Sequence, residues 1–241
     1  MANTLIKLLL APLLIWQGKQ VRKHTPRLPE ASGAREGEIH GEMPPLRVLI
    51  CGDSAAAGVG VSGQHQALSG QLIRELQRCY PQRAITWKLW AKNGDTTANT
   101  LVKLHLKPAE TFDVVVTSLG VNNVTGGTGQ GKFYQQQCAL INLLLKKYKA
   151  QKIILTALPP MHLFPALPQP LRWVLGNDAK ALTRQLFKAA ATSAKCSVLQ
   201  VNFPLTANTI ASDGFHPGIA GYQLWAQAVA RKIHDSLRGY C

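Results

Sequence analysis

Along the chain, short apolar runs alternate with longer stretches whose apolar residues recur at helical spacing. The strand-like runs are Leu46–Cys51, Ala84–Trp90, Asp113–Leu119, Lys152–Leu158 and Ser197–Val201. The helix-like stretches are Gln66–Arg78, Lys132–Lys149, Gly176–Ala194 and Ile219–Leu237. Regular alternation of strands and helices is typical of a parallel sheet covered on both faces. The pattern therefore predicts an α/β fold, a three-layer α/β/α sandwich around a central, mostly parallel sheet.

The first residues do not follow this alternation. Leu5–Trp16 is an apolar run interrupted by Lys7 and Pro12, and it is shorter than the roughly 20 residues that a membrane-spanning helix needs. Basic residues follow it, among them Lys19 and Arg22. This combination predicts that residues 1–20 associate with an anionic membrane surface, which would place the protein in the cytoplasm, peripheral at the inner face of a membrane. Two alternatives are a helix packed on the body and an export signal, although no small-residue cleavage site follows.

Residues 21–45 are rich in proline, glycine and charge and show little apolar periodicity. They are interpreted as a linker or as an arm along the surface. The main domain is expected over residues 46–241. Within it, Pro159–Trp173 holds five prolines among apolar residues, which indicates a long loop near the functional face.

Charge and cysteine content narrow the range of partners. The chain has 27 Lys and Arg against 12 Asp and Glu, a net charge of +15, which favours anionic partners such as a membrane surface. The basic residues are scattered and form no nucleic-acid-binding motif, so nucleic acid is not expected as a partner. Five widely spaced cysteines indicate buried thiols in a reducing compartment. No metal-ligand spacing is present, and neither a metal nor an organic cofactor is predicted.

Candidate chemistry lies where the predicted strands end, because ligands bind beyond the carboxyl ends of parallel strands. Gly52-Asp53-Ser54 follows the first strand, Asn93-Gly94 the second and Gly120-Val121-Asn122-Asn123 the third, and Asp213 and His216 precede the last helix. A serine needs a base to become a nucleophile, and a carboxylate orients that histidine base. Backbone N–H groups and an amide side chain stabilise the oxyanion that forms. These residue types together favour acyl transfer.

The same segments resemble the four sequence blocks of the SGNH (GDSL-type) hydrolases, in the family's order, over about residues 46–237. The resemblance implies a flavodoxin-like α/β/α fold with Ser54 as nucleophile, His216 as base and Asp213 as its orienting acid. It also implies an oxyanion hole made by the backbone N–H groups of Ser54 and Gly94 and the side chain of Asn122. No metal or organic cofactor would be needed.

Two positions depart from that pattern, since Ala55 replaces the leucine of GDSL and Asn123 replaces the final aspartate of the third block. Other nearby residues have structural interpretations. Asp53 is expected to support the turn, Asp95 to cap a helix starting at Thr96, Cys51 to be a core thiol, and His162 is a weaker candidate for contact with substrate.

The sequence therefore predicts a serine ester hydrolase that cleaves acyl esters, with a lysophospholipid or another lipid-like ester as an example of substrate. Alternatives are a carbohydrate O-deacetylase or an acyltransferase of the same fold, and a membrane-associated binding module without turnover.

Overall fold

The computed structural model describes residues 2–201 and 204–238. Its strands are β1 (Glu36–Ile39), β2 (Met43–Gly52), β3 (Arg83–Ala91), β4 (Val114–Ser118), β5 (Lys152–Thr156) and β6 (Cys196–Leu199). Its helices are α1 (Ala2–His24), α2 (Leu68–Cys79), α3 (Thr97–Leu106), α4 (Val121–Thr125), α5 (Gln130–Lys146), α6 (Leu171–Ala190) and α7 (Ile219–Arg238), with a 3₁₀ turn η1 at Met161–Leu163.

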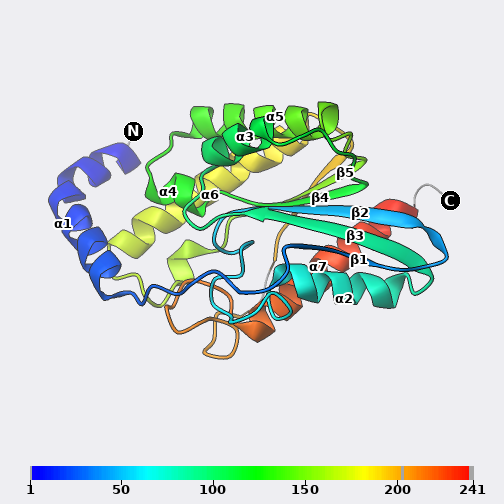
Figure 1. The fold of residues 1–241 in the computed structure, drawn as a ribbon. Helices are drawn as coiled ribbons and strands as arrows, with labels where there is room; N and C mark the ends of the chain where they lie inside the picture. The colour runs from blue at the N-terminus through cyan, green and yellow to red at the C-terminus, as the bar shows by residue number, and fades with distance from the viewer. Residues whose placement is uncertain (1, 202–203, 239–241) are drawn as a thin grey trace.

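The strands form one six-stranded sheet in the order β1-β3-β2-β4-β5-β6. All neighbours are parallel except β1, which pairs antiparallel with β3 at one edge. Helices α3, α5 and α6 cover one face, and α2 and α7 cover the other (Figure 1). The predicted three-layer α/β/α architecture is confirmed.

Side-chain alternation along the strands explains the two faces. On β4, Val115 belongs to the core cluster of α5 and α6, whereas Val114 and Val116 belong to the cluster of α2 and α7. On β5, Ile153 and Leu155 face the first cluster and Ile154 the second. Because successive residues of a strand point to opposite faces, a continuous apolar run buries both sides.

The segment expected as a linker is more ordered than its composition indicates. Residues 21–45 contain the end of α1, all of β1 and the first residues of β2. The Arg35 side chain donates hydrogen bonds to the Ala91 carbonyl at 2.9 Å and to Glu30 at 3.1 Å. This segment therefore runs along the sheet edge and is held there by specific hydrogen bonds.

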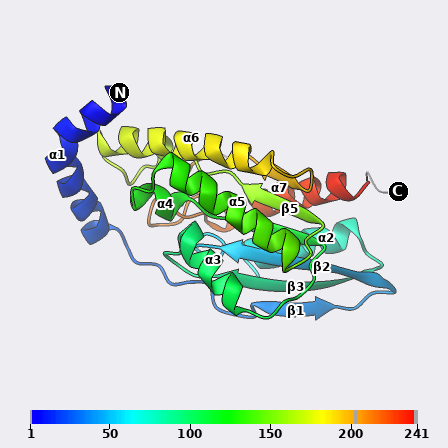
Figure 2. The same ribbon diagram turned by 90° about the horizontal axis from the view of Figure 1, so that it is seen from above.

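Helix α1 packs beside the start of α6 at the end of the molecule toward which the parallel strands run (Figures 1 and 2). Leu14 and Val21 contact the core cluster of α5 and α6. The Gln17 side chain is buried; it donates to the Gln169 carbonyl at 2.7 Å and accepts from the Leu171 backbone N–H at 3.1 Å. In the described part of the chain, the helices fall short of the length and apolar character required to cross a bilayer.

Candidate active site

The turn after β2 is built so that Ser54 projects beyond the sheet edge. The Asp53 backbone N–H donates to the Ser118 carbonyl at 3.1 Å, and the Ser54 carbonyl accepts from the Val59 N–H at 3.0 Å. Gly52 lies so close to β4 that a Cβ there would come within 2.4 Å of the Ser118 carbonyl oxygen. The tight approach of these two strand ends explains the glycine before Asp53.

The three alanines after Ser54 have different surroundings. Ala56 and Ala57 are fully buried, whereas Ala55 lines the catalytic cavity. At the next position, Gly58 has φ +85°, and a Cβ there would meet Ala31 and Ala67 at 2.6 and 2.7 Å. Two of the alanines are thus required by packing, and only Ala55 leaves space beside the nucleophile.

Asp213 and His216 come from one loop before α7, as their spacing predicted. One Asp213 oxygen accepts from the backbone N–H groups of Phe215 at 2.9 Å and His216 at 3.0 Å. The other oxygen lies 2.5 Å from His216 Nδ1, and His216 Nε2 lies 2.8 Å from Ser54 Oγ. The structure therefore joins Ser54, His216 and Asp213 in one continuous hydrogen-bonded chain.

The carboxyl groups of this region have opposite pKa shifts. Burial disfavours ionisation of Asp213, but the hydrogen bonds from the His216 ring and from the two backbone N–H groups outweigh it, so the pKa of Asp213 is lowered. Burial raises the pKa of Asp53 to about 7, against the hydrogen bond that its carboxylate accepts from the Ala55 N–H at 3.2 Å. Asp53 thus supports the turn, as predicted, and Asp213 remains ionised next to the histidine.

The predicted oxyanion groups differ in placement. Asn122 lines the cavity from α4, and its Nδ2 donates to the Asp95 carbonyl at 3.0 Å. An amide nitrogen carries two hydrogens, so one remains for a ligand. Gly94 has φ +83° and is not among the described residues that line the cavity, whereas its neighbour Asn93 is.

Asn123, the second departure from the family pattern, has a structural role. It is buried, and its Oδ1 accepts from the backbone N–H and the hydroxyl of Thr97 at 3.1 and 3.0 Å. Its Nδ2 donates to Thr128 and Gln136, both at 3.3 Å. The neutral amide, with both donor and acceptor atoms, connects the start of α3 to the turn after α4 and to α5.

The expectations for three further residues have different outcomes. The helix cap assigned to Asp95 is wrong, because Thr96 and Asn99 form a reciprocal capping box at the start of α3, while Asp95 pairs with Lys103 at 2.5 Å. Cys51 is fully buried in the core as expected, and burial raises its thiol pKa to about 12. His162 lies on η1 and lines a neighbouring cavity, which shares Leu158, Pro159 and Pro160 with the cavity beside Ser54; His162 is not among the described residues that line the latter.

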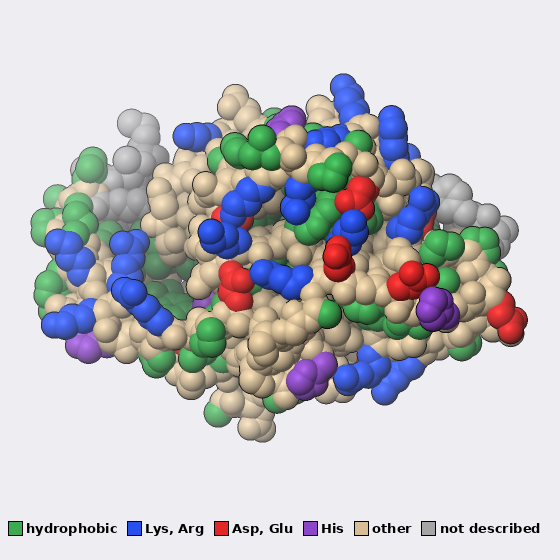
Figure 3. All heavy atoms as spheres, in the orientation of Figure 1, with side chains coloured by type: hydrophobic (Ala, Val, Ile, Leu, Met, Phe, Trp, Pro, Cys, Tyr) green, Lys and Arg blue, Asp and Glu red, His purple; other side chains and the backbone are tan. Residues whose placement is uncertain are grey.

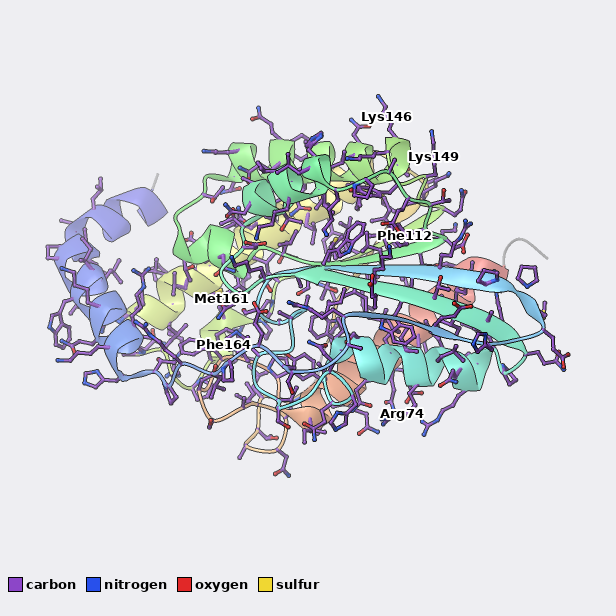
Figure 4. The ribbon with its side chains drawn as sticks, viewed as in Figure 1. Arg74, Phe112, Lys146, Lys149, Met161 and Phe164 are labelled. Carbon is purple, nitrogen blue, oxygen red and sulfur yellow. The ribbon has the colours of Figure 1, made fainter. Side chains whose placement is uncertain are left out.

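The cavity beside Ser54 has a volume of about 240 Å³ and mostly apolar walls. Its lining includes Leu119, Val121, Leu158, Phe164, Leu205, Ile210 and Phe215, together with Thr156 and Trp225. Phe164 and Phe215 meet edge to face, with ring centroids 5.7 Å apart. Phe164 lies near Met161 toward the carboxyl ends of the strands, whereas Phe112 lies further along the sheet (Figure 4).

Sequence reasoning missed Thr156 and Trp225. Thr156 ends β5, so the strand-end rule that selected Asn122 applied to it as well. Trp225 belongs to the apolar stripe of α7, which indicates core packing and gives no signal of a role at a cavity. Among the described residues, no group of three or more His, Cys, Asp or Glu side chains is placed to hold a metal ion.

Comparisons with known proteins identify the family and the fold. The family model of the GDSL-like lipase/acylhydrolases matches residues 50–224. Among curated proteins, no sequence matches the chain.

Solved structures share the fold, and three of them illustrate the likeness. They are an acetyl xylan esterase variant from Geobacillus stearothermophilus (18% identity, TM-score 0.55, 81% of this chain and 96% of that one), TesA (22%, 0.57, 78% and 97%) and a lipase/acylhydrolase from Enterococcus faecalis (20%, 0.56, 78% and 94%). At these identities the likeness extends to the fold alone.

Proposed function

The chain belongs to the GDSL-like lipase/acylhydrolase family and is a carboxylic ester hydrolase, and from this premise we propose that Ser54, His216 and Asp213 are its catalytic triad. The observation that carries this proposal is the hydrogen-bonded chain from Asp213 through His216 to Ser54 Oγ at the wall of an apolar cavity. Nucleophile and base lie within hydrogen-bond distance, and the base is in turn oriented by a carboxylate.

In this mechanism His216 Nε2 takes the proton of Ser54 Oγ as that oxygen attacks the ester carbonyl carbon. The negative charge on the carbonyl oxygen is stabilised by the second amide hydrogen of Asn122 and by the backbone N–H of Ser54, both of which line the cavity. His216 then gives its proton to the departing alkoxide oxygen. Water, deprotonated by His216, attacks the acyl carbonyl carbon, and His216 gives that proton to Ser54 Oγ as the acyl–serine bond breaks, which releases the acid and restores the free serine.

The cavity favours a small ester. Its volume of about 240 Å³ lies below the roughly 300–1,000 Å³ of pockets that enclose drug-sized ligands. A short acyl group fills such a space, whereas most of a long lipid chain would lie outside it. We therefore expect turnover to be highest for short-chain esters and to fall as the acyl chain lengthens.

The test is hydrolysis of p-nitrophenyl esters of increasing chain length by the wild type and by Ser54→Ala. The variant is expected to lose about 10⁴-fold or more in kcat, and a fluorophosphonate probe is expected to label the wild type and not the variant. Ser62→Ala is the matched control. The Ser62 hydroxyl donates a hydrogen bond to the Gln66 side chain, and the residue does not line the cavity. Retained activity in Ser54→Ala, or absence of labelling in the wild type, would contradict the proposal. The second result would favour a binding module without turnover.

Helix α1 supports a second proposal, that the protein docks on anionic membranes. Its outer face exposes Leu8, Leu9, Leu13, Ile15 and Trp16, and the next turns expose Lys19, Arg22 and Lys23. Figure 3 shows hydrophobic and basic side chains together at this end. Apolar side chains followed by cations match the acyl region and the anionic headgroups of a bilayer. The cytoplasmic face of a membrane supplies such a surface.

Vesicle sedimentation tests the docking. Full-length protein is expected to bind vesicles containing anionic lipid and to be released by salt, and Ile15→Glu with Trp16→Glu should abolish binding. Leu106→Glu is the control, because Leu106 is 82% exposed on α3, away from α1. If the wild type, the double variant in α1 and Leu106→Glu bound vesicles equally, the proposal that α1 is the membrane-binding element would be overturned.

A further inference from the structure

Two buried polar atoms on the wall of the catalytic cavity have no hydrogen-bond partner among the described residues. They are Oγ1 of Thr156 and Nε1 of Trp225, and Trp225 as a whole is only 4% exposed. Buried donors and acceptors are nearly always paired in folded proteins, because losing water without a replacement partner is costly. A ligand or a water molecule in the cavity would supply the partner.

The two residues lie on the same side of the sheet. Thr156 comes two residues after Ile154 on β5, so both side chains point toward α7. Ile154 and Trp225 belong to the same core cluster. The adjoining wall of the cavity is made by Val201, Leu205 and Ile210, which offer no polar side-chain atoms.

The indole of Trp225 is held in place next to the nucleophile turn. Its ring stacks on Tyr222, one turn earlier on α7, with centroids 6.1 Å apart and an interplanar angle of 15°. The Tyr222 hydroxyl is hydrogen-bonded to the carbonyls of Ala55 at 2.9 Å and Val59 at 2.7 Å. The N–H of Trp225 is therefore a pre-positioned donor, and positioned donors give specificity at small entropic cost.

We propose that Thr156 and Trp225 form a specificity subsite for an oxygen atom of the substrate. An indole N–H only donates, so its partner must be an acceptor, while the threonine hydroxyl donates or accepts. The substrate class is a short ester that carries a hydroxyl, ether or carbonyl oxygen in addition to its ester group. This inference rests on the proposed ester hydrolysis and adds the selectivity of the same cavity.

The oxygen can belong to the alcohol part or to the acyl part, and three matched esters separate these sources. Propyl butyrate is the parent, glyceryl monobutyrate adds hydroxyls to the alcohol, and propyl 3-hydroxybutyrate adds one to the acyl group. The measured quantity is selectivity, the kcat/KM of each oxygenated ester divided by that of propyl butyrate. In the wild type we expect selectivity for one of the two oxygenated esters to exceed unity.

Trp225→Phe keeps the aromatic ring and removes the donor, and Thr156→Val keeps the shape and removes the hydroxyl. Each is expected to lower that selectivity on the order of 10-fold. Trp173→Phe, which alters a 42% exposed tryptophan on α6, should leave selectivity unchanged. Selectivity that is equal in wild type, Trp225→Phe and Thr156→Val would overturn the proposal and leave the two atoms as partners of structural water.

Unfolding measurements supply an independent readout. Since the Thr156 hydroxyl has no partner among the described residues, Thr156→Val, which keeps the shape of the side chain, should not lower the unfolding midpoint; a marked loss would show an internal partner and contradict the inference. Failure of the proposed ester hydrolysis can be told apart from failure of the subsite alone. If the proposed hydrolysis is wrong, no butyrate ester is hydrolysed in a Ser54-dependent manner. If Ser54-dependent hydrolysis is present and selectivity does not respond, only the subsite is wrong.

Discussion

The catalytic edge and helix α1 lie at the same end of the molecule but are held by different means. Around Ser54 and His216, turn backbone and side chains are bonded in a dense network in which Asp213 alone accepts three hydrogen bonds. Helix α1 is attached by an apolar stripe and by the two hydrogen bonds of Gln17.

The difference matches the roles proposed for the two regions. Acyl transfer needs the reacting atoms to lie within a fraction of an ångström of their productive positions, so the surrounding residues must hold them rigidly. A surface helix that docks on another body needs only to present its outer face. Substitutions at the edge should therefore change rate or stability strongly, and those under α1 should change local mobility.

Asp213→Asn should have the largest effect. The amide oxygen can still accept from the backbone, but an amide in place of Oδ2 no longer stabilises the charged imidazole or fixes its tautomer. We expect kcat for a short ester to fall about 10³- to 10⁴-fold, with unchanged circular dichroism. A loss below about 10-fold would show that the short His216–Asp213 contact is not part of catalysis.

Asp53→Asn probes the electrostatics of the same edge. Burial raises the Asp53 pKa to about 7, against about 3.9 in an unfolded chain. Between these values the folded state binds an extra proton, so stability must fall as pH rises, by about 1.4 kcal/mol per pH unit. Over about three units the contribution amounts to about 4 kcal/mol.

Urea unfolding at several pH values between about 5 and 8 measures this slope. Relative to Asp53→Asn, the wild type should lose stability with increasing pH up to about 7 and then level off. Parallel curves for the two proteins would mean that Asp53 is ionised throughout, held by His216 and by the Ala55 N–H.

These edge residues were also those most accessible from sequence. Ser54, Asn122 and His216 occupy turns after strands or before a helix, where composition and order carry information about chemistry. β1 was not predicted, because its residues, EGEI, include one apolar side chain and form a strand through pairing with β3.

The helix start at Thr96 shows a similar limit. Asp95 and Thr96 are both good capping residues, and the choice between them depends on Lys103, which attracts Asp95 away from the helix end. The sequence pattern places Trp225 in the core, and its burial confirms this. Its nitrogen has no partner because α7 borders the cavity at this residue, which the pattern does not show. Residues that depend on such tertiary contacts cannot be found by local pattern.

Asn122→Ala tests the oxyanion role. Removing the donor should reduce kcat on the order of 10²-fold, while the free energy of unfolding changes little, because Asn122 is only half-buried and makes one side-chain bond, to the Asp95 carbonyl. An unchanged rate would exclude Asn122 from the oxyanion hole and leave stabilisation to backbone N–H groups.

Asn123→Ala should show the opposite profile. The variant leaves the buried Thr97 backbone N–H without an acceptor, which costs about 1–3 kcal/mol of unfolding free energy. Urea denaturation measures that loss, and kcat should change less than in Asn122→Ala. If the two neighbouring variants behaved alike, the division between a catalytic and a structural asparagine would be wrong.

Gln17→Ala should have the smallest effect on activity and the most local one on structure. The substitution removes both bonds between α1 and the start of α6, so backbone amides of α1 should exchange hydrogen faster while those of the sheet keep their protection. Lys19→Ala, exposed on the same helix, is the control.

Whether α1 matters to chemistry depends on what separates it from the triad. A cavity lined by Gln20, Val21 and His24 of α1 also borders Asp213 and the loop at residues 165–168. Since Asp213 takes its hydrogen bonds from its own loop and not from α1, release of the helix should change kcat by less than about 3-fold. A larger loss in Gln17→Ala would show that α1 shields the aspartate, and docking of the outer face on a membrane would then bear directly on catalysis.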